Sequence, residues 1–97
     1  MQILIRQATI DDKKAIWDFI EVAYGDHAKE KIPVRWNWQF YDHPLTNKSQ
    51  KALPIYIAIK DGHIVGQLCA IQIYMKIGEE IYPAVAGCDF IVLPECR

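Results

Sequence analysis

The stretch that decides the fold is YIAIKDGHIVG, residues 56–66, in which apolar and mostly β-branched segments flank Asp61-Gly62. β-Branched residues favour extended strands, and Asp-Gly between two apolar runs is among the strongest signals for a two-residue hairpin turn. The sequence therefore predicts two antiparallel strands, over residues 55–59 and 64–75, joined by a tight turn.

A second hairpin follows directly, with its turn at Gly78-Glu79 and its outer strand over residues 81–93. Glycine in the first turn position suits a type II′ turn. If the loop has two residues, Cys69 falls opposite Cys88 at a separation of roughly 5.5 Å, which could in principle be bridged. A bulge between the turn and this pair would break the pairing.

The N-terminal segment reads as a short strand over residues 3–8 and then a helix that starts at Thr9. Thr9 is a suitable N-cap, and the two aspartates after it lie where the helix dipole favours negative charge. Gly25 is expected to end this helix. The apolar positions follow the helical period, and we expect them to face the core together with Trp17 and Tyr24: Ile16, Phe19, Ile20 and Ala23.

Residues 27–53 are the least regular part of the chain, and an aromatic cluster lies in the middle of them. In a helix Val34, Trp38 and Tyr41 share a face, whereas in a strand residues 34, 36, 38 and 40 alternate. The flanking prolines, Pro33 and Pro44, favour a short helix. The polar residues 45–52 are then a loop.

The predicted order is strand, helix, short helix and three antiparallel strands, which is an α+β fold. Both faces of the predicted strands are largely apolar, which is typical of a sheet covered on both sides. Two helices, one of them short, are too few for that, so the sheet is expected to be incompletely covered.

Composition describes one soluble domain and excludes several partner classes. The 97 residues are 52% hydrophobic and 24% charged, with a net charge of -1. This balance provides no basic field for nucleic acid or anionic membranes. Lys29, Lys31 and Arg35 with the nearby tryptophans offer a cationic, stacking surface for single-stranded nucleic acid. Packing of these aromatic side chains in the core is the favoured interpretation. No apolar run approaches the roughly 20 residues of a membrane span, and no signal peptide precedes the first strand, so we expect a cytoplasmic protein with no nucleic-acid or membrane partner.

The cysteines and histidines suggest no metal centre. Cys69, Cys88 and Cys96 form no C-x-x-C pair, and the three histidines have no ligand spacing. An odd cysteine count fits reduced thiols better than a disulfide scaffold. A nucleophilic Cys with a His base has no support in the sequence.

Three segments in order resemble the GNAT family of N-acetyltransferases. Residues 5–9, IRQAT, followed by two aspartates, are similar to the opening of the family's first strand and capped helix. Residues 56–66 are similar to its strand 2–strand 3 hairpin. Residues 89–97, DFIVLPECR, are similar to its fourth strand and the Val-x-Pro-Glu-x-Arg entry to the acetyl-CoA loop. The matches span nearly the whole chain, although residues 27–53 match nothing.

The resemblance implies a single partial domain, residues 1–97, that is the N-terminal half of the GNAT fold. In the family the arginine of Val-x-Pro-Glu-x-Arg opens a loop, Arg/Gln-x-x-Gly-x-Gly/Ala, whose amides cradle the diphosphate of acetyl-CoA. Arg97 matches this arginine, and the sequence stops there. The resemblance further implies transfer of an acetyl group from acetyl-CoA to the primary amine of a small molecule or a protein. These 97 residues alone are expected to be inactive.

The resemblance also implies a cofactor site on the fourth strand. Phe90, Ile91 and Val92 match the segment whose backbone contacts the acetyl and pantetheine part of the cofactor in relatives, and Arg97 matches the first loop position. Asp89 is the best-placed acid to take the amine proton. An ordinary polar strand residue, paired with a neighbouring cation or facing solvent, is an equally good interpretation of Asp89.

The acceptor site of relatives is built by the first two helices and their connection. By region, Trp36, Trp38 and Tyr41 are the candidates to line it here. A different class of function remains open: a non-catalytic binding module that uses the aromatic segment 36–41, or a homodimer formed through the uncovered sheet.

Overall fold

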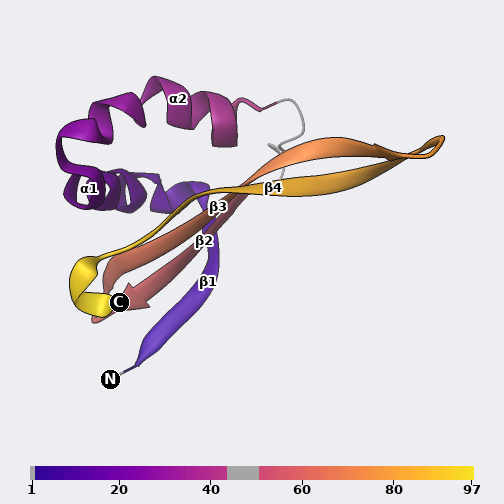
Figure 1. Ribbon diagram of the computed structural model, residues 1–97. Coiled ribbons are helices and arrows are strands. Elements are labelled where there is room, and N and C mark those ends of the chain that lie inside the picture. The colour runs from indigo at the N-terminus through magenta and orange to yellow at the C-terminus, as the bar shows by residue number, and fades with distance from the viewer. Residues whose placement is uncertain (1, 44–50) are drawn as a thin grey trace.

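The computed structural model describes residues 2–43 and 51–97, and its elements follow the predicted order (Figure 1). The helical elements lie between the first and second strands, except for one short turn after the last strand. In chain order they and the strands are β1 Ile3–Thr9, η1 Ile10–Asp12, α1 Lys13–Tyr24, η2 Gly25–Glu30, α2 Val34–Trp36, η3 Asn37–Tyr41, β2 Ala52–Lys60, β3 His63–Ile77, β4 Glu80–Val92 and η4 Pro94–Cys96. The α+β prediction is confirmed.

The four strands form one antiparallel sheet in the order β1-β2-β3-β4. Asp61 and Gly62 both have positive φ, 53° and 79°, as a type I′ turn requires. At the second turn Gly78 has φ 63° and Ile77 pairs with Glu80, as predicted. Counting back, Cys69 pairs with Cys88, and both thiols are free.

Helix α1 begins through a single 3-10 turn. The Thr9 backbone N–H donates to Asp12 Oδ2 at 2.8 Å, and Arg6 makes a two-pronged contact with the same carboxylate, 2.8 Å for each nitrogen–oxygen pair. The helix ends at Tyr24, followed by Gly25 with φ 56°. Ile16, Phe19 and Ile20 are buried, so the predicted apolar face is confirmed.

The aromatic segment is helical, as the prolines indicate. One α-helical turn, α2, continues into the π-helical turn η3. Val34, Trp38 and Tyr41 are exposed on it, whereas Trp36 and Phe40 are buried. Pro44 and the loop expected over residues 45–50 lie outside the described residues.

The helices cover one face of the sheet (Figure 1). The core lies between the helices and that face and includes Trp36, Phe40, Ile16, Ile55 and Ile57. On the opposite face of the described sheet, large apolar side chains are exposed to solvent, among them Ile5, Tyr56, Leu68 and Phe90. The expectation of an incompletely covered sheet is confirmed, because every described helix of more than one turn precedes β2 and packs on the same side.

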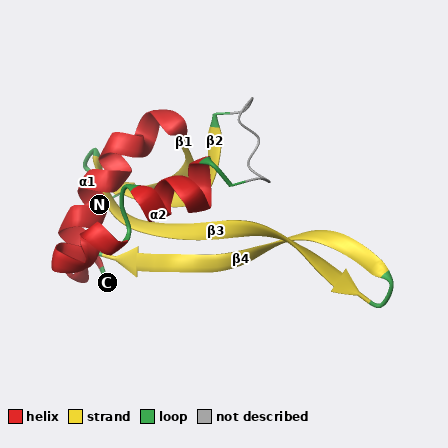
Figure 2. Ribbon diagram, turned by 90° about the horizontal axis from the view of Figure 1, so that it is seen from above, coloured by secondary structure: helices red, strands yellow, loops and turns green. Residues whose placement is uncertain are grey.

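The β3–β4 hairpin continues past the helices as a long arm (Figure 2). The molecule is 47 Å long in this direction against 29 Å and 25 Å in the other two. Its radius of gyration is 14.5 Å, larger than the ~12.5 Å of a compact chain of this length. The arm carries exposed apolar residues, including Tyr74, Ile77, Ile81 and Val85.

Candidate functional site

A bulge in β4 is the local irregularity around which the candidate site is built. Gln67 pairs with Ile91 and Cys69 pairs with Cys88, so Asp89 and Phe90 both lie opposite the single residue Leu68. Asp89 takes φ 50°, a left-handed conformation that aspartate adopts more readily than most residues. A bulge of this kind re-aims the side chains beside it. It separates the directions of Asp89 and Phe90 and leaves the Cys69–Cys88 pair intact.

The four residues implied for cofactor binding meet around one hollow at the outer edge of β4. This open hollow of about 400 Å³ is lined by Phe90, Ile91, Val92 and Arg97. β4 is the last strand of the sheet, so its outer backbone edge has no partner strand among residues 2–43 and 51–97.

Arg97 is brought back to this edge by the turn η4, in which the Cys96 amide donates to the Leu93 carbonyl at 2.9 Å. Its Nε then donates to the Val92 carbonyl at 2.9 Å. An apolar edge with unpaired backbone groups and a cation at one end suits a long acyl-thioester chain that carries phosphates. The residues present therefore fit acetyl-CoA in chemistry.

A second hollow adjoins the first on the face of the sheet that the helices leave bare. It measures about 370 Å³, and its apolar lining includes Ile5, Tyr56, Leu68 and Phe90. Gly66 lies at its floor, where an added Cβ would come within 3.3 Å of Val92 Cγ2. Glycine at this position therefore permits the close approach of β3 to β4 beneath Phe90.

The side chain of Asp89 faces the helical layer and not the bare face. Lys31 Nζ lies 3.0 Å from Asp89 Oδ1, and Arg35 Nη2 lies 4.0 Å from the same oxygen. The side chains of Asp89 and Lys31 are only 12% and 19% exposed. The sequence left two interpretations of Asp89 open, a proton acceptor or a polar strand residue paired with a cation. The structure shows the ion pair of the second interpretation.

Tyr24 and Gln67 complete the surroundings of this ion pair. The Lys31 ammonium lies 4.9 Å from the centre of the Tyr24 ring. Gln67 is 5% exposed, and its Nε2 donates to the Asp89 carbonyl at 3.3 Å. Its Oε1 is buried without a hydrogen-bond partner among the described residues. Burial raises the pKa of the Tyr24 hydroxyl, and the negative charge of Asp89 raises it further.

The two facing thiols lie beside the same cluster and are poor nucleophiles. Burial is the main cause that raises the pKa of Cys69, and the neighbouring Cys88 and Asp89 add to it. Burial also raises the pKa of Cys88. Both groups are therefore protonated thiols at neutral pH, as small hydrophobic residues would be.

The three candidates for the acceptor site are divided by the structure. Trp36 is 2% exposed and packs edge-on between Trp17 and Phe40, with 5.7 Å between ring centres in each pair. Its side chain belongs to the core and is not on the surface. Trp38 is 63% exposed, with its ring against His43, and Tyr41 is partly exposed, 5.6 Å from Lys13 Nζ.

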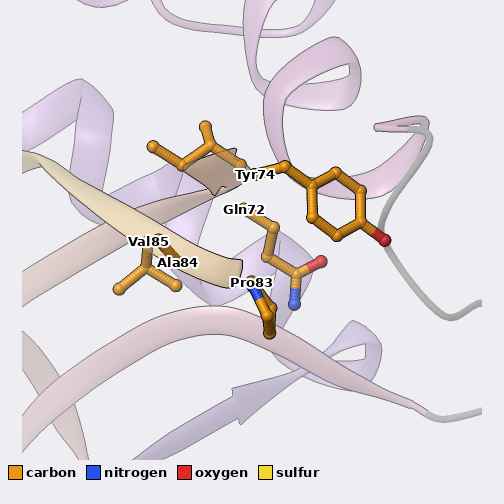
Figure 3. A pocket seen from close by; sticks show the side chains of 6 residues that line it. Gln72, Tyr74, Pro83, Ala84 and Val85 are labelled. Atoms are coloured by element: carbon orange, nitrogen blue, oxygen red, sulfur yellow. The ribbon is translucent and has the colours of Figure 1, made fainter. Parts of the chain in front are cut away.

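A further hollow of about 430 Å³ lies on the β3–β4 arm and shares no residue with the two hollows described above (Figure 3). It is lined by Gln72, Tyr74, Pro83 and their neighbours, and none of the sequence-predicted site residues contributes to it. Within the described ranges no three His, Cys, Asp or Glu side chains gather as a metal site would need. None of the helices there has the length and apolar character that crossing a bilayer requires.

The sequence did not point to the partners of Asp89. The sequence offers Lys31 and Arg35 only as part of a cationic surface, and it assigns no role to Gln67. Lys31 and Asp89 are 58 positions apart, and only the fold brings them together. A polar residue within an apolar segment, as Gln67 is within residues 64–71, is the available hint of a buried polar cluster.

One known protein family matches this order of strands and helices. The family model described as an acetyltransferase (GNAT) domain matches residues 4–97, almost the whole chain. No curated protein and no solved structure matches the chain. The matched segment contains the predicted strand–helix opening, both hairpins and the edge hollow of β4. The chain belongs to the GNAT acetyltransferase family.

Proposed function

We propose that this protein takes part in transferring an acetyl group from acetyl-CoA to a primary amine. The observation that carries the proposal is the edge hollow of β4. Phe90, Ile91, Val92 and Arg97 line it together, although Arg97 lies five positions beyond the strand. Membership of the GNAT family supports acyl transfer in general.

The cofactor, when bound, supplies an activated acetyl thioester. In the proposed reaction the amine nitrogen forms a bond to the acetyl carbon, the carbon–sulfur bond breaks, and CoA leaves as a thiolate. The proton that the amine loses passes to Asp89 and from there to solvent or to the thiolate. The chain's own part is to hold the apolar arm along β4 and a phosphate near Arg97. A free amide on the edge of β4 is suited to donate to the thioester carbonyl.

Asp89 is the proposed acceptor of the amine proton. Its carboxylate lies one residue before the hollow and is mostly shielded from water. Lys31 and Arg35 hold it in place, so its position is fixed before an acceptor arrives. A positioned carboxylate of this kind can bind an ammonium and receive its proton.

Trp38 and Tyr41 are the proposed acceptor-side residues, because they are exposed on the helical segment in front of the sheet. Trp36 supports that segment from beneath. The five glycines of these residues include no Gly-x-Gly sequence that could cradle a diphosphate. We therefore expect these 97 residues by themselves not to turn over.

The test uses the natural protein with acetyl-CoA and a panel of primary amines. Release of the CoA thiol and the mass of the acetylated amine report the reaction, and calorimetry reports acetyl-CoA binding. Arg97→Ala is expected to weaken binding about tenfold, because a charge-assisted phosphate contact contributes roughly 1.5–3 kcal/mol in favourable cases. Lys14→Ala, an exposed lysine on α1, is the matched control. Acetyl-CoA binding that is absent, or equally strong in both variants, would contradict the proposal.

A second candidate function is a self-associating module, and the bare face of the sheet supports it. Tyr56, Leu68 and Phe90 form an exposed apolar patch of the kind that commonly marks an interface. The proposed partner is a second copy of the chain, which carries the same patch and only one net negative charge. Light scattering over a range of concentrations tests it, since Phe90→Lys should shift the mass to that of a monomer. A wild-type monomer at every concentration would exclude it.

A further inference from the structure

The ammonium of Lys31 lies in surroundings suited to any primary ammonium. It is 3.0 Å from a carboxylate oxygen of Asp89 and 4.9 Å from the centre of the Tyr24 ring. A carboxylate together with an aromatic face is the usual pair of contacts by which proteins bind an alkylammonium. Lys31 therefore fills a site that would also bind the amine of a ligand.

Gln67, which contacts Asp89, has a hydrogen-bond acceptor that Lys31 does not satisfy. Gln67 Oε1 is buried and has no hydrogen-bond partner among the described residues. A buried acceptor without a donor costs about 1–3 kcal/mol, so a ligand whose N–H reaches Gln67 Oε1 would remove a penalty present in the structure. The orphan oxygen is an observation independent of the ion pair.

Asp89 does not depend on Lys31 alone for its counter-charge. Arg35 Nη2 lies 4.0 Å from the same carboxylate oxygen and its side chain is about half-exposed. If Lys31 swings away, Arg35 still balances the carboxylate. The two cations around one carboxylate leave a local net charge of +1. This charge would repel an arriving ammonium unless Lys31 left the site.

Only the side chain of Lys31 has to move. Its backbone is fixed, because its N–H donates to the Ala28 carbonyl and its carbonyl accepts from the Trp36 amide, each at 2.9 Å. The four-carbon stem of lysine is flexible and carries a point charge that solvates readily. Displacement therefore needs rotamer changes and no rearrangement of the helices.

We propose that Lys31 is an internal occupant of the acceptor site, a tethered ammonium that an acceptor amine must displace from Asp89. The inference rests on the proposed function, and it adds that Lys31 competes with the acceptor amine for Asp89. A site occupied by its own chain for about nine-tenths of the time binds a ligand about tenfold more weakly than when it is free. Lys31 then selects acceptors that bring contacts beyond a bare amine.

The first test needs neither acetyl-CoA nor turnover. Lys31→Ala removes three carbons and the nitrogen and leaves the ammonium site vacant. The probe is n-butylammonium, an alkylammonium one carbon longer than the missing atoms. Added n-butylammonium is expected to raise the melting temperature of Lys31→Ala by about 5 °C at several times its dissociation constant, and that of the wild type by much less. The salt control is sodium chloride at equal ionic strength, and n-butanol is the uncharged control.

The matched variant is Lys14→Ala, which removes the lysine of a surface pair with Asp18 at a similar distance, 2.9 Å. It is expected to gain nothing from n-butylammonium. An equal rise in both variants, or no rise in Lys31→Ala, would overturn the proposal. The result stands whether or not the protein transfers acetyl groups.

The second test is kinetic and uses Lys31→Met, which keeps the stem of the side chain and removes the charge. The KM for a simple alkylamine is expected to fall about tenfold, with kcat changed less. A purely structural role for the ion pair predicts a lower melting temperature and a KM that is unchanged or higher, which would overturn the proposal. Both forms are compared in the natural protein of the acetylation assay, because the 97 residues alone are not expected to turn over. Turnover that is absent there in the wild type as well would contradict the proposed function, and the binding test would then decide this inference alone.

Discussion

The contact between Arg6 and Asp12 gives the sharpest stability prediction. Both guanidinium nitrogens lie 2.8 Å from carboxylate oxygens, and the Thr9 amide donates to the same carboxylate. The Arg6 hydrogen bonds are the main cause that lowers the pKa of Asp12 to about 2 from its usual 3.8. We predict that Asp12→Asn destabilises the protein, because asparagine keeps an oxygen for Thr9 and loses the charge.

The magnitude follows from the two pKa values. A lowered pKa means that the folded protein binds the proton less tightly than the unfolded chain, so the contribution to stability is present above pH 3.8 and is lost as the pH falls through 2. The shift corresponds to about 2.4 kcal/mol before screening. Since Arg6 is 40% exposed, we expect about 1–1.5 kcal/mol at pH 7. Roughly half should remain at pH 3 and little at pH 2.

Urea unfolding of wild type and Asp12→Asn at pH 7, 3 and 2 measures this difference. Asp18→Asn is the control, because its ion pair with Lys14 is exposed on both sides and should matter far less. The reasoning fails if Asp12→Asn loses no more stability than Asp18→Asn. It also fails if the loss at pH 2 equals the loss at pH 7.

Three further predictions concern single residues. Gly62→Ala should lower the free energy of unfolding by about 1 kcal/mol, because Gly62 has φ 79°. Gly87→Ala is the control, since Gly87 has open space around it and no positive φ, and urea unfolding should show a change less than about half as large. Iodoacetamide at pH 8 should leave Cys69 unmodified in the folded protein and modify it in urea, because burial raises the pKa of its thiol. Peptide masses report the modification, and fast labelling of the folded protein would contradict the burial of Cys69. Trp36→Ala should cost about 3–5 kcal/mol and Trp38→Ala much less in thermal or urea unfolding, and equal costs would contradict the placement of Trp36 in the core.

The hairpins could be predicted because turn chemistry is local. Asp61-Gly62 and Gly78 supply the positive φ values that tight turns need, so the register around them follows by counting. The same reasoning placed Cys69 opposite Cys88. The four residues that line the edge hollow of β4 also follow from the sequence, since the fourth strand and Arg97 carry the family resemblance. Their role in binding a cofactor stays a prediction.

The partners of Asp89 could not be predicted. No glycine marks the bulge at Asp89, and a left-handed aspartate inside a strand has no signature in the sequence. Helical periodicity placed Trp38 and Tyr41 on one face but could not say which face of the segment meets the sheet. That depends on how the helical segment packs on β2, which only tertiary structure decides. Trp36 was therefore assigned by region, and its burial came from packing.

The order β1-β2-β3-β4 has a consequence for the time course of folding. The two hairpins close over short loops and can zip from their turns, whereas β1 joins β2 by pairs such as Ile3 with Lys60, 57 positions apart. Closing that long loop costs more chain entropy and encloses both helical segments. During synthesis, the first strand to leave the ribosome waits unpaired until residue 60 has emerged. The strand made first thus waits longest for its partner strand, and its apolar residues depend on α1 or a chaperone for cover in the meantime.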